Sequence, residues 1–427
     1  MPLAASLYAR ARRAFQQLGA RSSGPVAAVP PASSEPAATP VDPALPPIPT
    51  DNVAKLARCP VCGDEERTPV CRFNRFAMFT WQPDEHAGSY YYALCHGCGV
   101  VYATRRPEGP RYRWLFQHFD DTLGRLEGRA GKFALTPRKL TDEDREQVRR
   151  LISRGVYVSD HLELRGGEYF PSLLADRLAS SVHVEIIGSL VPMQHARTLE
   201  IRTRVGSISD ALRRLFAADA RILTLFETQQ FVIEEVYRIP TKISIDYDAF
   251  TIPFDGPFDL IVANHMLTHA VRPREFLAEV SRHLAPGGHL YLYNEMNEDE
   301  YLVEGKSMFN FNPFHMQAFS RRALQRALAA NGFTTVFMTV HEGDHVCLAR
   351  KDPAAAAGCQ RMSDDERKRR RSGWRNAYEP AVLRMPPHAR WQVKDWDEVL
   401  KGAVGAGRAE VSRDGTVKVR GVKRARD

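Results

Sequence analysis

One segment in the second half of the 427-residue chain constrains the fold most strongly. It begins with the apolar run Phe258–Ala263, which has the near-continuous hydrophobicity of a parallel strand covered on both faces. A helical pattern over 274–284 follows, and the pair Gly287-Gly288 then leads into a second apolar run over 289–293. Strand, helix and strand in this order predict a crossover unit in a parallel sheet.

The same alternation extends over residues 182–351. We predict strands over 198–201 and 222–226, helices over 208–217 and from Ser320 onward, and an antiparallel strand pair over 332–337 and 345–349. The predicted fold class is therefore α/β: a Rossmann-like doubly wound sheet, preceded by a small module of the zinc-ribbon type that contains paired cysteines.

Composition separates the other parts of the chain. Residues 24–49 are rich in Pro, Ala and Ser and almost uncharged, so they cannot bury enough apolar surface to offset their ordering entropy. We therefore predict a disordered N-terminal segment and linker (1–52), a cysteine module (53–106), a helical connector or lid (107–181), the α/β domain (182–351) and a basic C-terminal extension (352–427).

Positive charge is concentrated near the C-terminus. Residues 361–427 hold 18 Lys+Arg and 10 Asp+Glu, an excess equal to the net charge of +8 of the whole chain. We interpret this part as a solvated tail. The alternative is that the run Arg367–Arg371 contacts nucleic acid or an anionic membrane surface. Nucleic-acid binding is the less favoured interpretation, because the aromatic residues nearby are few and widely spaced.

The sequence also bears on location. No apolar run approaches the ~18 residues that a membrane-spanning helix needs, so we predict no transmembrane segment. No signal-peptide pattern accompanies the seven cysteines, which argues against a secreted disulfide framework. We therefore expect a cytoplasmic protein.

Four of the cysteines form two knuckles of the pattern Cys-x-x-Cys-Gly, at Cys59–Gly63 and Cys95–Gly99. The two-residue gap lets both thiolates of a knuckle face one ion, and the glycine permits a tight turn around it. Two knuckles complete a closed tetrahedral site. We therefore predict structural Zn²⁺ bound by Cys59, Cys62, Cys95 and Cys98. The alternatives are a redox dithiol, two free pairs, or a ligand set that includes Cys71 or His96.

With these features the chain resembles the class I S-adenosylmethionine (SAM)-dependent methyltransferases. Within that family it is most similar to the subgroup with an N-terminal zinc-binding module, which includes sugar C-methyltransferases. The resemblance covers about Cys59 to Lys351 and is most specific over Phe258–Tyr293. The resemblance implies a sheet that binds SAM and a reaction that transfers its methyl group to a small-molecule acceptor.

In this family an acidic residue ends the first strand, and a Gly-x-Gly-x-Gly loop follows it. Glu200 matches the acid and Gly206 the last glycine, whereas Arg202 and Arg204 stand where the first two glycines belong. A non-glycine residue with a positive φ costs about 1–3 kcal/mol, and two guanidinium groups would compete with the methionine moiety of SAM. The resemblance further implies that Glu227 holds the ribose, that Asp248 lies near the adenine, and that Asn264 and His265 line the cofactor.

Two histidines are candidates for catalysis. His269 matches the end of the family's Leu-Glu-His segment, with Thr268 in place of the acid, and His315 matches a histidine that often faces the substrate. Either could serve as a base near neutral pH, and a packing role is the alternative for each. The predicted function is SAM-dependent methyl transfer to a small molecule such as a sugar. A catalytically silent binding or scaffold protein is the alternative, favoured by Arg202 and Arg204. A nucleic-acid-associated protein is the third hypothesis.

Overall fold

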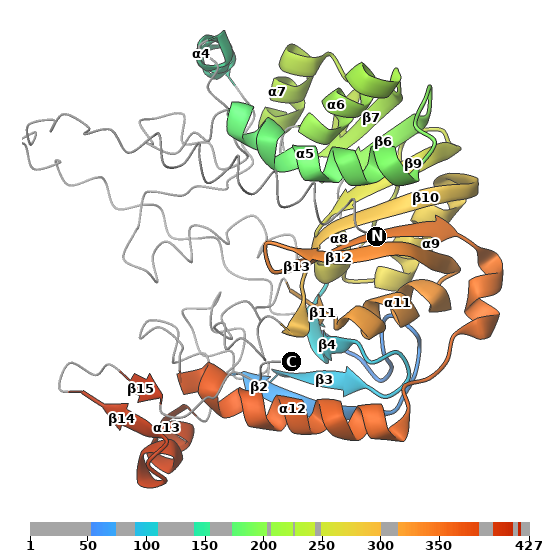
Figure 1. The fold of residues 1–427 in the computed structure, drawn as a ribbon. Helices are drawn as coiled ribbons and strands as arrows, with labels where there is room; N and C mark the ends of the chain where they lie inside the picture. The colour runs from blue at the N-terminus through green and yellow to red at the C-terminus, as the bar shows by residue number, and fades with distance from the viewer. Residues whose placement is uncertain are drawn as a thin grey trace, which may run out of the picture. The chain divides into compact units, whose positions relative to one another are not determined.

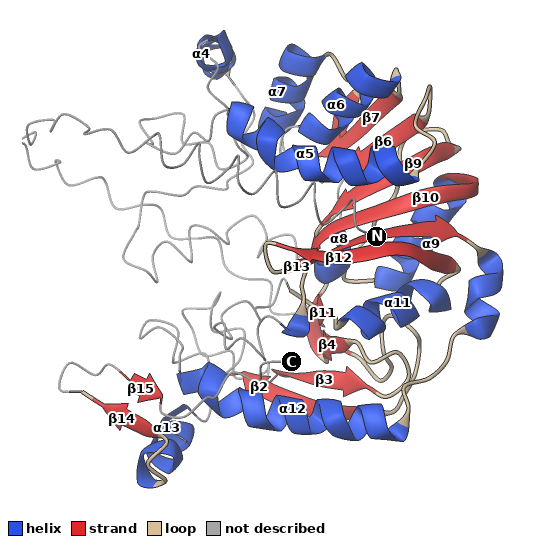
Figure 2. Cartoon of the chain, viewed as in Figure 1, coloured by secondary structure: helices blue, strands red, loops and turns tan. Residues whose placement is uncertain are grey.

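The largest sheet among the described residues has seven strands, in the order β12-β13-β10-β9-β6-β7-β8 (Figures 1 and 2). The computed structural model describes residues 53–73, 90–109, 141–153, 173–202, 206–224, 227–243, 249–299, 315–383, 396–412 and 417–419. The strands are β6 (Arg197–Ile201), β7 (Asp219–Thr224), β8 (Thr241–Ile243), β9 (Phe258–Asn264), β10 (Leu284–Glu295), β12 (Phe333–His341) and β13 (Asp344–Lys351).

The sheet is parallel from β8 to β10 and antiparallel at β12 and β13. This confirms the predicted α/β class and the predicted antiparallel strand pair. β9 is buried at every position except Asp259, as expected of a strand between two parallel neighbours. The second predicted strand, over 222–226, is confirmed with different bounds: β7 begins three residues earlier, at Asp219, and ends at Thr224.

Helices cover the sheet. On one face, α5 (Leu173–Leu190) and α6 (Ser207–Phe216) pack their apolar sides over β9, β10 and β13. Ile208 and Leu212 lie one turn apart on α6 and are both buried there, with Phe216 packed against them, as the predicted apolar face requires. Leu215, predicted on the same face, is exposed instead. Elsewhere α7 (Glu227–Tyr237) contacts β8, α9 (Pro273–His283) contacts β10, and α11 (Arg321–Ala330) contacts β12. The predicted helix start at Ser320 is confirmed, since its hydroxyl accepts a hydrogen bond from the Ala323 amide at 3.3 Å.

The cysteine module has a sheet of its own, formed by β2 (Arg67–Phe73), β3 (Tyr90–Cys95) and β4 (Val101–Ala103). Its fourth strand, β11 (Gln317–Ala318), comes from the distant segment between β10 and α11. A separate two-stranded ribbon pairs β1 (Val53–Lys55) with β5 (Arg105–Pro107). The module is therefore joined to the α/β domain by backbone hydrogen bonds as well as by the chain. Within the predicted connector, α4 (Asp142–Ser153) contacts α7.

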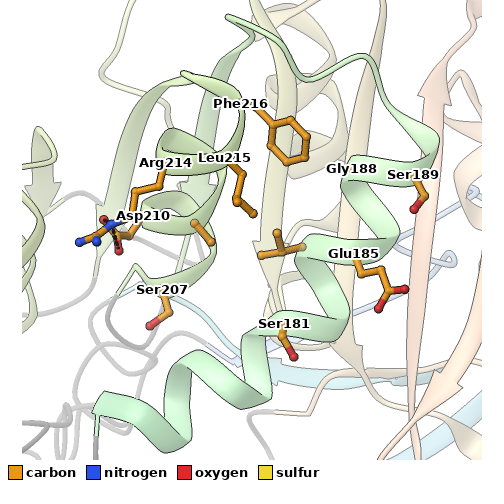
Figure 3. A pocket seen from close by; sticks show the side chains of 11 residues that line it. Ser181, Glu185, Gly188, Ser189, Ser207, Asp210, Arg214, Leu215 and Phe216 are labelled. Atoms are coloured by element: carbon orange, nitrogen blue, oxygen red, sulfur yellow. Dashed lines mark hydrogen bonds and ion pairs between the residues drawn. The ribbon is translucent and has the colours of Figure 1, made fainter. Parts of the chain in front are cut away.

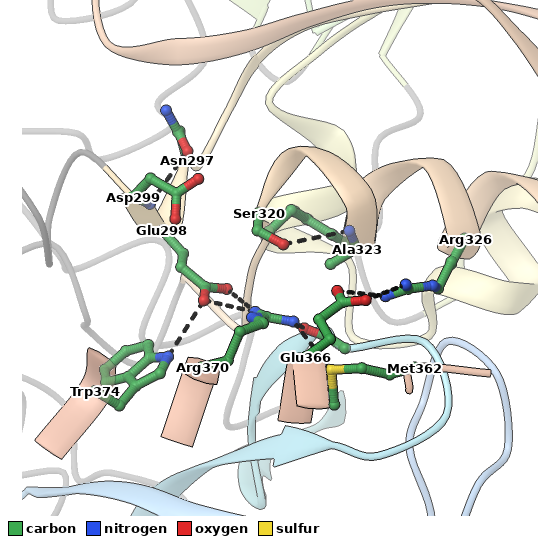
Figure 4. Close-up of polar contacts among 12 residues, drawn as sticks. Asn297, Glu298, Asp299, Ser320, Ala323, Arg326, Met362, Glu366, Arg370 and Trp374 are labelled. Carbon is green, nitrogen blue, oxygen red and sulfur yellow. Dashed lines mark hydrogen bonds and ion pairs between the residues drawn. The ribbon is translucent and has the colours of Figure 1, made fainter. Parts of the chain in front are cut away.

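The start of the C-terminal extension corrects our interpretation of a solvated tail. Helix α12 (Asp364–Leu383) packs on the cysteine module, and Trp374 is only 2% exposed. Arg370, from the basic run, forms an ion pair with both carboxylate oxygens of Glu298, and the Trp374 indole donates to the same carboxylate at 3.2 Å (Figure 4). Part of the basic run thus compensates a buried internal acid, while its neighbour Arg371 is exposed.

Beyond α12, helix α13 (Trp396–Gly405) contacts α12 and the hairpin of β14 (Ala409–Val411) and β15 (Val417–Val419). A short 3₁₀ helix over Pro353–Gly358 links β13 to this part of the chain. Among the described helices, none has the length and apolar character needed to cross a membrane.

Candidate active site and cysteine cluster

The strand order reverses direction between β6 and β9. From β6 the chain continues outward through β7 and β8, and it then returns to the other side of β6 to build β9 and β10. Ligands of open α/β sheets bind at such a switch point, outside the carboxyl ends of the strands. Arg202 directly follows β6, Asn264 ends β9 and His265 follows it. The structure thus brings three of the residues singled out in the sequence to this one edge.

Three neighbouring strand ends here turn through the left-handed region of backbone conformation. The φ angles are 58° at Arg202, 55° at His265 and 58° at Asn294. Such values are uncommon outside glycine, cost of order 1–3 kcal/mol and cluster at functional sites. Arg202 therefore adopts the conformation for which the glycine of the related loops is suited. Arg204 lies outside the described residues.

Hydrogen bonds connect these turns. The Asn264 amide donates to the Arg202 carbonyl at 3.2 Å and accepts from the Asn294 amide at 2.9 Å. The Arg202 guanidinium donates to the His265 carbonyl at 3.3 Å, so it lies across the switch point. Asn294 was not singled out in the sequence. A polar residue near the end of a buried strand was the signal that could have identified it.

Gly206 begins α6 after the loop and has a φ of 76°. A Cβ atom at this position would lie 2.7 Å from Cδ1 of Ile222, so both backbone conformation and space require glycine. Nearby, the buried carboxylate of Glu200 accepts hydrogen bonds from the Ser209 amide at 3.0 Å and the Ser209 hydroxyl at 2.6 Å. Glu200 therefore stabilises the first turn of α6, whatever else it contacts.

His265, His269 and His315 lie together, and we call them the histidine triad. His265 precedes the short helix α8 (Met266–His269), His269 ends it, and His315 precedes β11. Their ring centroids are separated by 4.6 Å for His265 and His269 and by 5.0 Å for each of the other two pairs. Both predicted catalytic histidines thus join a predicted cofactor residue. The i, i+4 spacing of His265 and His269 was the available signal for that pair, since side chains four positions apart can meet across one helical turn.

Burial governs the charge of the triad. It holds the pKa of His265 well below its usual range, and the neighbouring His315 and Arg202 act in the same direction. Burial likewise lowers the pKa of His269, followed by the effects of Arg202 and the other two histidines. These two imidazoles are therefore neutral at physiological pH.

Glu295, at the end of β10, holds α8 in place. Its carboxylate accepts hydrogen bonds from the Leu267 amide at 3.0 Å and from the Thr268 amide and hydroxyl at 2.8 Å. Burial raises the pKa of Glu295 to about 7, against the lowering effect of these donors. Thr268, which replaces the acid of the related motif, is thus a structural partner of Glu295. Sequence reasoning missed Glu295.

Two predicted cofactor contacts cannot be placed. Glu227 is the first residue of α7, but its side chain lies outside the described residues, and so does the whole of Asp248. Both assignments stay predictions.

The four cysteine thiols of the two knuckles form one cluster, in which every sulfur lies within 4.8 Å of the others. Cys59 and Cys98 approach to 3.8 Å, and Cys62 and Cys95 to 3.5 Å. Four sulfurs at about 2.3 Å from a tetrahedral ion lie roughly 3.8 Å apart, so this donor set fits zinc.

Both knuckle glycines have a φ of 81°, as the pattern predicted. His96 is not a ligand candidate here, since its Nε2 is hydrogen-bonded to the Thr68 hydroxyl at 2.8 Å. The Cys71 side chain is outside the described residues.

The cysteine module also supports the histidine triad. The Tyr92 hydroxyl donates to the backbone carbonyl of His315 at 2.5 Å. Arg106 is fully buried and donates to the Gln317 side chain at 2.9 Å and to the Val271 carbonyl. Gln317 in turn donates to the carbonyls of Leu267 and Ala270, at 2.6 and 2.9 Å, on either side of His269. A continuous buried network therefore runs from the module to α8.

Two cavities lie away from the triad. The larger, of about 640 Å³, is a groove between α5 and α6 (Figure 3). Figure 3 shows Arg214 paired with Asp210 at its rim, and Phe216 faces Gly188 across it. The smaller, of about 280 Å³, adjoins Arg370 and Trp374. Of the predicted site residues that the structure describes, none lines either cavity.

Comparison with known proteins supports the fold. Residues 174–336 match the family model of a methyltransferase domain. A search of curated proteins found no match.

Among solved structures, a SAM-dependent methyltransferase from Mesorhizobium loti is 15% identical, with a TM-score of 0.34, and the match covers 40% of this chain and 97% of that one. SAM-bound CalS10, an amino pentose methyltransferase from Micromonospora echinaspora, is 15% identical with a TM-score of 0.32, covering 40% and 90%. A SAM-dependent methyltransferase from Aquifex aeolicus is 14% identical with a TM-score of 0.31, covering 40% and 93%. On the family match and the strand order, residues 174–336 and the seven-stranded sheet have the fold of the class I SAM-dependent methyltransferase domains.

Proposed function

We propose that the protein is a SAM-dependent methyltransferase that acts on a small molecule. The observation that carries this proposal is the switch point, where Arg202, Asn264 and Asn294 are linked by hydrogen bonds at the carboxyl ends of adjacent strands. This edge is where the fold binds its ligands. In the proposal, SAM lies there against Gly206, Asn264 and His265, with Glu227 on the ribose and Asp248 near the adenine.

Methyl transfer is an in-line displacement at the sulfonium methyl group, so alignment of the acceptor contributes most, and a base is needed for a poorly nucleophilic acceptor. His269 and His315 are the groups proposed to face the acceptor. The imidazole of His269 is unprotonated at physiological pH, so the form that a base requires is present, while burial and the nearby Arg202 weaken its affinity for a proton. A sugar or a related metabolite is the acceptor class suggested by the resemblance to the zinc-module subgroup.

We further propose that the four-cysteine cluster binds structural Zn²⁺. The thiol spacing supports this, and a closed four-thiolate site has no open position for a substrate. Bound zinc would hold the two knuckles together. Through Tyr92 and Arg106 the module then keeps α8 and the segment at His315 in position. A cytoplasmic location stays part of the same proposal.

The alternative function, a catalytically silent binding protein, is favoured by one observation. The Arg202 guanidinium lies across the switch point on the His265 carbonyl, where it would repel the positive sulfonium of SAM. In that case the fold would bind an anionic ligand or a partner protein.

Calorimetric titration with SAM and with S-adenosylhomocysteine separates the two functions. We expect micromolar binding of both ligands by the full-length protein and loss of binding in Glu227→Ala. Glu275→Ala, which removes an exposed acid of α9, is the matched control and should bind as the wild type does. Absence of binding at millimolar ligand would contradict the enzyme and favour the silent protein.

A further inference from the structure

The histidine triad has a donor geometry that methyl transfer does not require. It offers three imidazoles from three separate backbone positions, and one ring nitrogen of each lies within 4.8 Å of the other two. Three imidazoles on one tetrahedral ion, with metal–nitrogen distances of about 2.0–2.1 Å, place their ring centroids roughly 5 Å apart. The observed separations of 4.6, 5.0 and 5.0 Å match that arrangement.

A buried atom within the triad points to a ligand. Nε2 of His265 is shielded from solvent and has no hydrogen-bond partner among the described residues. A buried nitrogen lone pair without a partner is destabilising, and a metal ion would satisfy it directly. The rings also stand nearly perpendicular in two of the three pairs, at 72° and 83°. This orientation is not that of stacked rings packed for apolar contact.

The backbone around the triad is held in advance of any ligand. Glu295 fixes α8 through Leu267 and Thr268, and the Met316 amide donates to the Thr268 carbonyl at 2.8 Å, which ties the segment at His315 to α8. Such supporting contacts are typical of metal sites, where they orient the ligands.

We infer that the histidine triad binds a divalent transition-metal ion of the Zn²⁺ class, with an open coordination position. A three-histidine set leaves the fourth position of a tetrahedral ion free, as in catalytic zinc sites. Arg202 adds positive charge next to His265 and His269, so the fourth ligand should be anionic: hydroxide, or an ionised oxygen of the methyl acceptor, such as an enolate, phenolate or carboxylate. The acceptor part of this inference rests on the proposed function, whereas metal binding itself does not.

The ion changes the roles of the histidines. When it is bound, His265, His269 and His315 act as ligands, and none of them holds a proton for the acceptor. The ion then supplies the polarisation that lowers the pKa of the acceptor oxygen. The protein contributes the three ligands, the fixed α8 and the positive charge of Arg202.

Cobalt titration of the full-length protein tests the inference. The protein is first treated with a chelator at a strength that leaves the closed cysteine site loaded with zinc, and metal analysis verifies its retention. We expect one equivalent of Co²⁺ to bind without the strong near-ultraviolet thiolate charge-transfer absorption of a cysteine-bound ion. Failure to take up Co²⁺ at millimolar concentration, or uptake with thiolate absorption only, would overturn the inference.

Variants locate the site. His269→Ala and His315→Gln should each weaken Co²⁺ binding by more than about 100-fold. His195→Asn, at an exposed histidine outside the triad that also has a positive φ, should bind Co²⁺ unchanged. Equal binding by all three variants would overturn the assignment. Circular dichroism confirms that each variant is folded. If a variant is not folded, the cobalt absorption spectrum of the wild-type protein decides whether the ion is bound without thiolate ligands. SAM titration of the same samples tests the proposed function separately, because loss of SAM binding with intact Co²⁺ binding would contradict only the methyltransferase.

Discussion

Tyr92 of the cysteine module donates its hydroxyl hydrogen bond to the backbone carbonyl of His315, at 2.5 Å, across 223 positions of sequence. The carbonyl belongs to a member of the histidine triad, so the module contacts the candidate active site directly. Arg106 and Gln317 extend the same connection to both sides of His269. The module is therefore a support for the site and not an independent appendage.

Removing that hydroxyl tests the support. Tyr92→Phe leaves the ring in place but deprives the His315 carbonyl of a donor, so we expect a loss of about 1–3 kcal/mol in the free energy of unfolding. We also expect weaker Co²⁺ binding by the triad. Urea unfolding and cobalt titration measure the two effects. Tyr237→Phe, which removes a hydroxyl next to Ser207 instead, should affect stability but leave Co²⁺ binding intact. Unchanged stability in Tyr92→Phe would contradict the role given to the module.

Zinc removal should disrupt the module first. Cys98→Ser deletes one of the four thiolates, and closed zinc sites lose both the ion and the local fold when a ligand is lost. We expect metal analysis to find about one zinc fewer per chain than in the wild type, together with a lower melting temperature. Cys359→Ser is the matched control, because Cys359 is half-buried and outside the cluster. Full zinc content in Cys98→Ser would mean that the cluster is not the zinc site.

The loop before α6 should tolerate no side chain at its last glycine. Gly206→Ala combines a positive φ with a contact of 2.7 Å to Ile222, so we expect it to lower the free energy of unfolding by about 1–3 kcal/mol and to weaken SAM binding. Gly373→Ala is the opposite case. Its position on α12 is exposed and open, so the substitution should be neutral or stabilise by up to about 1 kcal/mol. Equal unfolding curves for the two variants would contradict this difference.

The ion pair under α12 should couple two distant segments. Arg370→Met leaves the Glu298 carboxylate buried without its guanidinium, which costs about 3–5 kcal/mol. Burial already raises the pKa of Glu298, and the loss of Arg370 removes its main counteracting charge. The double variant Glu298→Gln/Arg370→Met should recover part of the loss. Arg371→Met, one residue on and exposed, should change stability little. Urea unfolding of the four proteins completes the test.

The free energy of unfolding should decrease as the pH is lowered, because of His183. This histidine belongs to α5 and is buried, its Nδ1 lies 2.9 Å from the Tyr291 hydroxyl, and the His341 ring is next to it. Burial lowers its pKa to about 4, against about 6.5 in the unfolded chain. The unfolded state therefore takes up the proton first. The resulting stability is fully present above about pH 6.5 and is lost as the pH falls toward 4, by on the order of 3 kcal/mol. His183→Phe should flatten this part of the curve relative to the wild type. Parallel curves would contradict the assignment.

The sequence predicted the central sheet well because its strands have strong local signals. Phe258–Ala263 is apolar throughout, and the cap at Ser320 is read from one residue. It did not predict β11, since two residues carry no periodicity and their pairing with β4 depends on tertiary contact. Nor did it predict the burial of α12. The charge pattern of α12 is that of an exposed helix. Its burial depends on Glu298, which compensates the charge of Arg370 and is brought opposite to it by the fold.

The candidate site was predicted only in part, because the sequence identifies single residues but not which of them the fold brings together. The family resemblance selected His265, His269 and His315 individually, but their meeting depends on how closely α8 and the segment before β11 approach one another. The backbone conformation of the loop could also be predicted from the sequence: Arg202 stands where the related loops have glycine, and its φ is positive. Glu295 and Asn294 were not accessible, because an acid and an amide at a strand end are common, and their partners are known only from the fold.

The pairing of β11 with β4 has a consequence for the order of folding during synthesis. The knuckle cysteines leave the ribosome early, but the strand that covers the edge of β4 is made only after almost all of the α/β domain. Until then β4 presents open hydrogen-bonding groups, a surface to which other nascent chains can add a strand. The edge of β4 thus stays uncovered while the chain from β5 to β10 is made, and a fragment ending after β5 would keep that edge permanently open.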